Sequence, residues 1–464
     1  MVENTARRLG EEKVSKLLWQ FSLPSIISTL ASSIYIIIDR IFIGQVVGAA
    51  AIAGMSVTMP ISFIILSFGM LIGVGSTALV SMRLGERNEE EAETILGNTV
   101  TMILVISILT TLVFLFFLKK ILIVFGASPA ILPYAEDFIR IILWGSVSQY
   151  ILICLPNTIR AEGYPQKAMY IQLINVGINI VLDFLFICLW GWGVRGAAMA
   201  TVIAQTTASI LVFHHFLSPN SPLHLKLINL RLRLPIVKGI IAIGGAAFTT
   251  QVAGSMINIL YNQNLARYGG DDAIGAYGIM YPILAFLILP VFGINFGAQP
   301  IIGFNYGAGR YERVIETVKK AILASTVIAT AGFILLEVFA RQMFGIFTED
   351  ANVIAIGSHG MRIMVMLLPI AGFNLVSGCL FQAIGRARIA LMLTMLKQVV
   401  ILIPALIVLP RYLHLNGIWI SGPISDVTAA IATIIVILPE IRSLRNKSSH
   451  GVMGTVLLTQ PAKR

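Results

Sequence analysis

Asp183 stands in the middle of an apolar segment, where a carboxylate needs a chemical reason. Hydrophobic residues flank it from Ile180 to Ile187, and no basic residue is near it in the sequence. Asn179 comes one helical turn earlier and Asn175 two turns earlier. This spacing places three polar groups along one face of a helix, as the lining of a water-filled cavity requires. The alternative is structural, with the asparagines joining neighbouring helices by hydrogen bonds.

Asp39 is a second carboxylate, close to the end of another apolar segment. It follows Tyr35 by one helical turn and directly precedes Arg40. Two neighbouring carboxylates oppose each other's ionisation, so at least one of them binds a proton more readily. Two carboxylates, an amide and a hydroxyl together also offer four hard oxygens, which suit Na⁺. An Asp39 at the water interface, capped by Arg40, is the alternative. We predict a site for H⁺ or Na⁺ formed by Asp39, Asn179, Asp183 and Thr201.

The composition indicates which elements must hold these groups. Of the 464 residues, 57% are hydrophobic and 12% are charged, whereas soluble domains have about 25% charged residues. Apolar runs of about 18 or more residues recur along the chain and predict an all-α polytopic membrane protein, because within lipid a helix satisfies its own backbone polar groups. A soluble enzyme and a nucleic-acid-binding protein are excluded as primary roles, and the net charge of +11 is read as cytoplasmic Lys and Arg.

Twelve apolar segments are expected to cross the membrane as helices, in two pseudo-symmetric six-helix lobes. We expect a cytoplasmic N-terminal segment at 1–16, an N-lobe at 17–217, a cytoplasmic inter-lobe connection at 218–238, a C-lobe at 239–440 and a cytoplasmic tail at 441–464. The polar connection contains three prolines. The segments begin near Leu17, Ala51, Thr99, Ile141, Ala168, Gly196, Gly239, Ala273, Ile322, Ile363, Ala390 and Gly417.

The two halves repeat each other in a register of 222 residues, the interval between Gly75 and Gly297. Gly85 and Gly307 keep the same interval. Six helices per half make the repeat parallel, so that both halves enter the membrane from the same side. In this register Asp39 aligns with Tyr261 and Asp183 aligns with Ala405, so the acidic site belongs to the first half only.

Basic residues indicate the orientation. Most of the 33 Lys and Arg residues fall in the tails and in alternate loops, which predicts cytoplasmic N- and C-termini. A helix rises about 1.5 Å per residue. Measured from the Lys and Arg residues at the ends of their segments, Asp39, Asp183 and Thr201 are expected at similar depth in the outer part of the membrane.

Charged residues also occur inside apolar segments of the second half. Glu337 has Arg341 four residues later, and we expect these two to form an ion pair along one helix. Lys397 and Asp426 lie in the last two segments. Mutual pairing and a polar cavity wall are both open for them.

The chain resembles the multidrug and toxic compound extrusion (MATE) family. The resemblance rests on the combination of twelve segments, Asp39 in the first, the run from Pro156 to Gly163 after the fourth, and Asn179 to Asp183 in the fifth. It is greatest to the prokaryotic DinF-like or MepA-like branch, whose acidic residues lie in the N-lobe. Other branches place acids in the seventh and eighth helices, whereas in this chain the seventh offers Gln251 and Asn258 and the eighth offers none.

The resemblance implies an antiporter that exports lipophilic organic cations in exchange for Na⁺ or H⁺ through alternating opening of two lobes. By position, the four residues of the predicted site match the family's N-lobe cation site. Pro24 matches a proline at which family helices bend, and we expect it to act as a hinge. Further cavity or substrate residues are expected at Tyr35, Asn157, Asn175, Gln251 and Asn258.

Two other functions compete with this interpretation. A lipid-linked saccharide flippase of related fold would need a strongly basic cavity, and Lys397 is the only basic residue deep in a segment. An intramembrane aspartyl protease would carry Gly-x-Gly-Asp at its second aspartate, whereas Asp183 follows Ile180, Val181 and Leu182. We therefore expect no enzymatic activity.

The expected partners follow from the same interpretation. No phosphate-binding G-x-x-x-x-G-K-[ST] sequence occurs, so ion gradients rather than ATP should drive transport. We expect no cofactor besides the coupling ion, H⁺ or Na⁺. The lipid bilayer and small cationic drugs are the expected partners, with no nucleic acid, and the protein is expected to be a monomer. The expected location is the prokaryotic plasma (inner) membrane, crossed many times.

Overall fold

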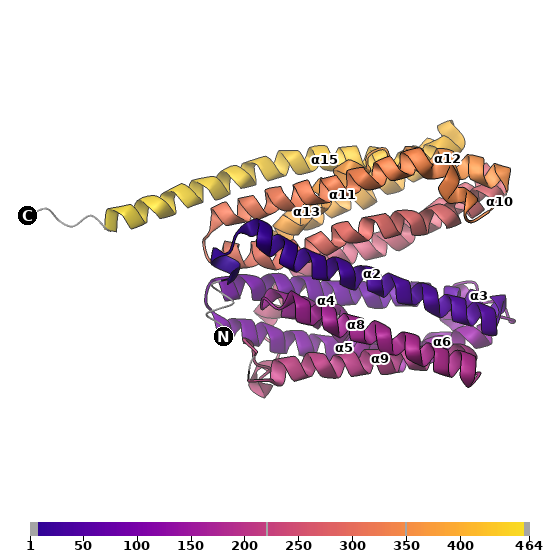
Figure 1. Ribbon diagram of the computed structural model, residues 1–464, viewed down its shortest axis with the longest axis horizontal. Coiled ribbons are helices and arrows are strands. Elements are labelled where there is room, and N and C mark those ends of the chain that lie inside the picture. Colours follow the sequence, from indigo (N-terminus) through magenta and orange to yellow (C-terminus); the bar gives the residue numbers. More distant parts are fainter. Residues whose placement is uncertain (1–7, 220, 349, 459–464) are drawn as a thin grey trace, which may run out of the picture. The chain divides into compact units, whose positions relative to one another are not determined.

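The computed structural model describes residues 8–219, 221–348 and 350–458, and within these ranges the chain forms helices and no strand (Figure 1). The first half comprises α2 (Val14–Val46), α3 (Ala49–Val57), α4 (Met59–Gly85), α5 (Glu89–Val124), α6 (Leu132–Trp144), α7 (Ser146–Ala161), α8 (Pro165–Asp183), η1 (Phe184–Leu189) and α9 (Gly193–Leu217). The remainder comprises η2 (Leu227–Leu230), α10 (Leu234–Gly307), α11 (Tyr311–Gly345), α12 (Ala351–Val365), α13 (Leu368–Ala383), α14 (Ala387–Met395), η3 (Leu396–Leu402) and α15 (Ile403–Leu458).

The described helices account for a twelve-span membrane protein. Nine are long and apolar enough to cross a membrane, and each of two bent helix pairs adds one more span. Helix α10 has non-helical backbone at Gly270, and the parts before and after this residue are already counted as two of the nine spans. Helix α15 has non-helical backbone at His414. Dividing the last long helix at His414 gives the twelfth span, so the all-α polytopic fold is confirmed.

The fourth span of each half is broken, which the sequence had not indicated. In the first half, α6 and α7 meet at Gly145 with a bend of 58°; in the second, α12 and α13 bend by 47°. The span expected to begin near Ile141 therefore begins at Leu132. Glycine is a poor helix former, and Pro369 at the start of α13 has no N–H to donate into a preceding turn.

The helix boundaries follow the 222-residue register. Helices α5 and α11 begin at Glu89 and Tyr311, and α8 and α14 begin at Pro165 and Ala387, each pair 222 residues apart. Helices α7 and α13 begin and end in the same register. The repeat is therefore a property of the folded helices as well as of the sequence.

Packing divides the chain into two units that are not continuous in sequence. Unit 1 consists of Leu23–Val80 and Glu89–Met256, and unit 2 consists of the described parts of 2–22 and 257–464 together with Ser81–Asn88. The beginning of α2 thus packs in unit 2, and the beginning of α10 packs in unit 1. The sequence-based lobes follow the chain without these exchanges, and their role as transport units stays a prediction.

The glycines that mark the repeat lie where helices cross closely. In unit 2, a Cβ atom on Gly85 would lie 2.0 Å from the carbonyl oxygen of Phe304, and one on Gly307 would lie 2.0 Å from that of Met82. In unit 1, a Cβ atom on Gly75 would meet the carbonyl oxygen of Ile240 at 2.1 Å. Small residues allow membrane helices to approach until their backbones touch, so a side chain at these crossings would separate the helices.

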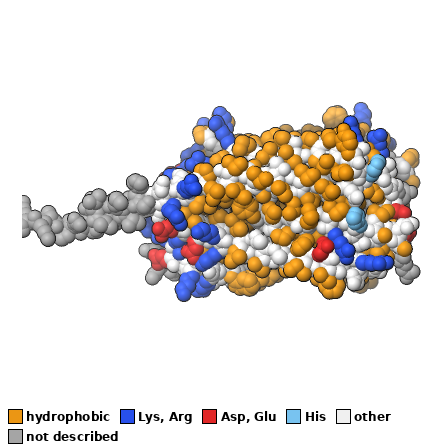
Figure 2. All heavy atoms as spheres, turned by 90° about the horizontal axis from the view of Figure 1, so that it is seen from above, with side chains coloured by type: hydrophobic (Ala, Val, Ile, Leu, Met, Phe, Trp, Pro, Cys, Tyr) orange, Lys and Arg blue, Asp and Glu red, His pale blue; other side chains and the backbone are white. Residues whose placement is uncertain are grey.

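Hydrophobic side chains cover much of the surface. Figure 2 shows a face on which they fill the middle, while Lys and Arg gather toward the two ends. Phe116, Val124 and Trp144 are among the large hydrophobic residues that are mostly exposed. Such a surface is unsuited to water and matches the hydrocarbon core of a bilayer.

Candidate functional site

Helix α8 directs three polar side chains into unit 1. Asn175, Asn179 and Asp183 are all buried, and Asp183 has no exposed surface. Their spacing of four residues places them on one helix face, while the exposed Val181 lies on another. Asp39, on α2 of the same unit, is also buried, and its carboxylate is close enough to Asp183 for the two charges to interact.

These groups carry five buried oxygens without a hydrogen-bond partner in the part of the chain that the structure describes. They are one carboxylate oxygen of Asp39, both of Asp183, and the amide oxygens of Asn175 and Asn179. Arg40 donates toward the sulfur of Met59 at 3.7 Å; its charge acts on Asp39, but the two form no ion pair within the described residues. Buried acceptors are normally satisfied, so this arrangement is chemically suited to receive a proton or a hard cation.

Two hydrogen bonds join the helices around the site. The amide nitrogen of Asn179 donates to the hydroxyl of Thr201 at 3.3 Å and links α8 to α9. The amide nitrogen of Gln172 donates to the hydroxyl of Ser32 at 2.8 Å and links α8 to α2. Tyr35, one turn before Asp39, is close enough to both carboxylates to interact with their charges. The residues Ser32 and Gln172 had not been indicated by the sequence, because a bond across 140 residues leaves no local pattern.

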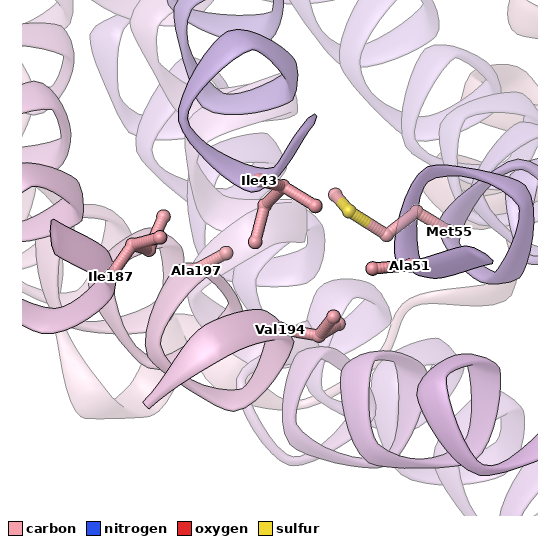
Figure 3. Close-up of a cluster of buried hydrophobic side chains, with 6 residues drawn as sticks. All are labelled: Ile43, Ala51, Met55, Ile187, Val194 and Ala197. Carbon is pink, nitrogen blue, oxygen red and sulfur yellow. The ribbon is translucent and has the colours of Figure 1, made fainter. Parts of the chain in front are cut away.

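A hydrophobic cluster fixes the helices immediately beyond the acids. It consists of Ile43, Ala51, Met55, Ile187, Val194 and Ala197, all buried. In Figure 3, Ile43 lies between Ala197 on one side and Met55 on the other. Because Ile43 and Ile187 follow Asp39 and Asp183 by four positions, the cluster packs about one helical turn from the two acids.

The backbone changes its winding directly after Asp183. Residues Phe184–Leu189 form a π-helical segment, η1. Phe186 stacks on the rings of Trp190 and Trp192 at centroid distances of 5.1 and 4.9 Å. Single π-helical turns occur frequently at functional sites, and here the aromatic stack packs the chain where it leaves α8.

The remaining predicted site residues, Asn157, Gln251 and Asn258, form no hydrogen bond with the carboxylate of Asp183. Asn157, near the end of α7, is bonded to Arg160 and to the carbonyl of Ile153. Gln251 belongs to unit 1, whereas Asn258, seven residues later on α10, belongs to unit 2 and accepts a hydrogen bond from the hydroxyl of Tyr277 at 3.3 Å.

Pro24 lies inside α2, and the helix passes from unit 2 to unit 1 between Ser22 and Leu23. Proline cannot donate to the carbonyl of Gln20, so one hydrogen bond of the helix is missing at this junction.

Ion pairs join several of the charged residues singled out in the second half. Lys397 and Asp426 form an ion pair with an Nζ–Oδ1 distance of 2.6 Å, which confirms the pairing alternative. Glu337 interacts with Arg362, whose Nε lies 3.9 Å from its carboxylate and donates to its backbone carbonyl. The expected pair with Arg341 was therefore wrong, because α12 packs beside α11 and brings Arg362 to Glu337.

No group of three or more His, Cys, Asp and Glu side chains able to hold a metal ion occurs among the described residues. The oxygen-rich set of unit 1 contains only two carboxylates, and its other donors are amides and a hydroxyl. Such donors suit a monovalent hard cation or a proton better than a transition metal.

The family model described as MatE matches residues 24–185 and 246–407. These two segments stand in the same 222-residue register as the helix boundaries. Proteins of similar sequence include the multidrug export protein MepA of Staphylococcus aureus (strain MSSA476), 27% identical over 427 residues that cover 91% of this chain and 93% of that protein. The MepA of Staphylococcus haemolyticus (strain JCSC1435) is 27% identical over 437 residues, covering 94% and 95%.

Solved structures give the same result. The MATE multidrug transporter DinF-BH, solved in complex with a ligand, is 35% identical with a TM-score of 0.86, and the match covers 93% of this chain and 97% of that chain. A MATE protein in the bent conformation matches with a TM-score of 0.89 over 96% and 99% of the two chains. At 23% identity this second likeness shows the shared fold.

Proposed function

Since the chain belongs to the MatE family, we propose that it is a secondary active multidrug efflux antiporter that exports organic cations in exchange for H⁺ or Na⁺. Similar proteins along almost the whole chain are named as multidrug exporters, and the 35% identical DinF-BH is named as a multidrug transporter. Those relatives are transporters, which also supports a non-enzymatic role.

Two buried carboxylates that form no ion pair within the described residues carry this proposal. Asp39 and Asp183 interact with each other, and the only basic side chain whose charge acts on Asp39 in the described part of the chain is that of Arg40. A charge in the membrane interior costs about 2.5–3.5 kcal/mol on insertion scales, and two neighbouring negative charges cost more. A cation must therefore neutralise the site for part of the transport cycle.

The coupling ion and the organic cation would compete for these charges. H⁺ or Na⁺ neutralises Asp39 and Asp183, with Asn179 and Thr201 supplying further oxygens, and the positively charged substrate loses its attraction and leaves. Tyr35 and Asn175 line the same region as polar substrate contacts. A ligand that binds one conformation better shifts the equilibrium toward it, so ion binding changes which side the cavity opens to.

Orientation and hinge complete the proposal. The distribution of Lys and Arg supports cytoplasmic termini, and the bacterial MepA relatives support a location in the bacterial plasma membrane. Pro24 is the proposed hinge, because the missing backbone hydrogen bond lies where α2 passes between units. A flippase of related fold would need free basic groups deep in the membrane, whereas Lys397 is neutralised by Asp426.

The test is ethidium transport into everted membrane vesicles, with a pH gradient and a Na⁺ gradient imposed separately. We expect Asp39→Asn and Asp183→Asn to abolish gradient-driven transport. Asp137→Asn, which changes an exposed carboxylate paired with Arg195, should transport like the parent protein. Parental transport by both site variants would refute the carboxylate site, and the gradient that drives the parent identifies the coupling ion.

A further inference from the structure

The connection between the two halves is tied to α5 by hydrogen bonds. Asn98 of α5 is fully buried, and its amide group accepts from the N–H of Arg233 at 2.7 Å and donates to the carbonyl of Arg231 at 3.2 Å. The hydroxyl of Thr101 donates to the carbonyl of Leu230 at 2.7 Å. The segment that contains η2 therefore has a fixed position beside the first turns of α5.

The contact between α5 and the connection is close and continuous. A Cβ atom on Gly97 would lie 2.3 Å from the carbonyl oxygen of Asn229. At the start of η2, Lys226 forms an ion pair with Glu93 of α5 at an Nζ–Oε2 distance of 2.5 Å. Every residue of α5 from 92 to 100 is buried. At this level the connection, rather than this stretch of α5, therefore forms the surface.

Helix η2 presents two large apolar side chains outward. Leu227 is 86% exposed, more than any other large hydrophobic residue in the described part of the chain, and Ile228 is 80% exposed. Asn229, the next residue, is buried. Apolar surface gains about 25 cal/mol per Å² when it leaves water, so a rigidly held and outward-facing apolar pair marks a contact with apolar surroundings.

The position of η2 along α5 corresponds to the edge of the hydrocarbon. The hydrocarbon core is about 30 Å thick and takes about 20 helical residues to cross. Counted back from Lys119, which is exposed near the far end of α5, this length ends near Thr99. The large exposed apolar side chains of α5 begin at Leu104. Because Thr101 holds the carbonyl of Leu230, η2 lies at the boundary between headgroups and acyl chains.

Basic side chains follow the exposed apolar pair. Arg231 and Arg233 are both exposed, and neither side chain forms an ion pair within the described residues. The three glutamates at 89–91, in the first turn of α5, precede Asn98 by at least seven residues, or about 10 Å of helix. The two arginines are therefore nearer to the hydrocarbon than these acids. Guanidinium groups pair strongly with phosphate oxygens, which are the anionic groups found at this depth of a bilayer.

We propose that the connection is an in-plane membrane anchor that binds anionic phospholipid. Leu227 and Ile228 insert between the acyl chains of the leaflet on this side, and Arg231 and Arg233 bind the phosphates of anionic phospholipids beside them. The apolar pair supplies the insertion and the arginines supply the preference for negative charge. The bonds of Asn98 keep the arginines at this level. This anchor goes beyond the proposed transport function and does not depend on the carboxylate site.

Spin labelling of the full-length protein tests the insertion. The protein is placed singly in nanodiscs of phosphatidylcholine and phosphatidylglycerol. A nitroxide is attached to Leu227→Cys in a protein that also carries Cys188→Ala, because the two remaining cysteines, Cys154 and Cys379, are buried. Oxygen concentrates among acyl chains, whereas a nickel chelate stays in water. We expect the label to collide more often with oxygen than with the nickel chelate.

Two labelled positions on α5 calibrate this measurement. Ile108→Cys, in the exposed apolar part of the helix, gives the value for lipid, and Glu89→Cys, exposed in its first turn, gives the value for water. A label at Leu227 nearer to the Ile108 value supports the anchor. A label nearer to the Glu89 value would place the connection in water and overturn it. Protection from both oxygen and the chelate would show cover by protein, from a second copy or another segment, and would also overturn it.

The preference for anionic lipid is tested in the same nanodiscs with a trace of photoactivatable phosphatidylglycerol or phosphatidylcholine. Mass spectrometry measures the crosslinks to the peptide 226–238, and we expect more with phosphatidylglycerol. A basic side chain near an anionic surface contributes about fivefold in binding, so Arg231→Gln with Arg233→Gln should remove this preference.

A matched control removes the same charge at the far end of α5. Lys119→Gln with Lys120→Gln changes two exposed basic residues there and should keep the parental crosslinking of the connection. Equal crosslinking by the two lipids in the parent protein would overturn the anionic-lipid site, as would an unchanged preference in the arginine variant. Neither readout measures transport, so failure of the anchor leaves the proposed function intact.

Discussion

Ile43 and Ile187 pack in one buried cluster, each one helical turn beyond a carboxylate of the candidate site. The contact fixes the distance between α2 and the end of α8 just past Asp39 and Asp183. A site for a small cation depends on such supporting packing, since a shift of about 1 Å is enough to spoil it.

Truncating the cluster should destabilise the protein and loosen the site. Ile187→Ala removes a fully buried side chain and is expected to cost about 2–5 kcal/mol of stability. Thermal unfolding of the purified protein should show a lower Tm, and transport should need a higher concentration of the coupling ion. Ile37→Ala, at an exposed position on α2, is the control, and an equal loss of Tm in both variants would contradict the role of the cluster.

Thr201→Val should weaken coupling-ion binding with little change of shape. The variant removes the hydroxyl that accepts from Asn179 and leaves the amide unpaired, at a cost of about 1–2 kcal/mol or roughly 5- to 30-fold in apparent affinity. The measurement is the ion concentration that gives half-maximal transport. Thr207→Val, on the same helix but bonded to the backbone carbonyl of Ile203, should not change this concentration. Equal effects of the two variants would contradict the assignment.

Breaking the ion pair of Lys397 and Asp426 should cost more than removing it altogether. Asp426→Asn leaves the ammonium unpaired, which costs about 3–5 kcal/mol for a fully buried pair. Both side chains are partly exposed, so we expect about 1–3 kcal/mol. Replacing both residues, as Lys397→Met with Asp426→Leu, should recover most of the Tm. A double variant less stable than Asp426→Asn would argue against the pair as the cause.

Glu162, a buried carboxylate that follows the last residue of α7 and lies 2.6 Å from Nε2 of His215, should make the stability of the protein depend on pH. The pKa of this carboxyl is raised in the folded protein because it is buried, so its contribution is full below the ordinary Glu pKa of about 4.3 and is lost as pH rises through the raised value. Glu162→Gln does not titrate. Its Tm relative to the parent should therefore rise with pH, by at most about 1.4 kcal/mol per pH unit in stability. A constant difference in Tm across pH would contradict the raised pKa.

Pro24→Ala should slow transport without unfolding the protein. The substitution restores an N–H that can donate to the carbonyl of Gln20 and stiffens α2 where it passes between units. The measurement is the initial rate of ethidium transport at a fixed gradient, where a loss of about tenfold would correspond to about 1.4 kcal/mol. Pro60→Ala, at the second residue of α4, is the control. An unchanged rate in Pro24→Ala would exclude the hinge.

The repeat could be predicted from the sequence because the glycines that mark it are required by close packing of helices. Gly85 and Gly307 were aligned by spacing alone, and each lies where backbones cross too closely for a side chain. Asn179 and Asp183 were placed on one helix face by their four-residue interval, and both are buried on that face. Local periodicity reports such features, since one helix and its nearest packing partner determine them.

Features that depend on distant segments were missed. The bend at Gly145 and the π-helical turn after Asp183 lie within continuous apolar runs. Glu162 and His215 are 53 residues apart, and only the arrangement of α7 and α9 brings them together. Glu337 was assigned to Arg341 from helical spacing, but Arg362 on the next helix lies beside it.

The first part of α2 belongs to unit 2 and the first part of α10 belongs to unit 1, and this affects the order in which the chain can fold. Unit 1 includes the start of α10 up to Met256, and unit 2 includes residues that precede Leu23. During synthesis, unit 1 can be completed only after residue 256 has been added. The helical turns before Leu23 can pack in unit 2 only after the second half of the chain has been made. If the chain were cut at the 218–238 connection, neither fragment would contain all the residues of one unit, so we expect the two fragments to fold properly only when both are present.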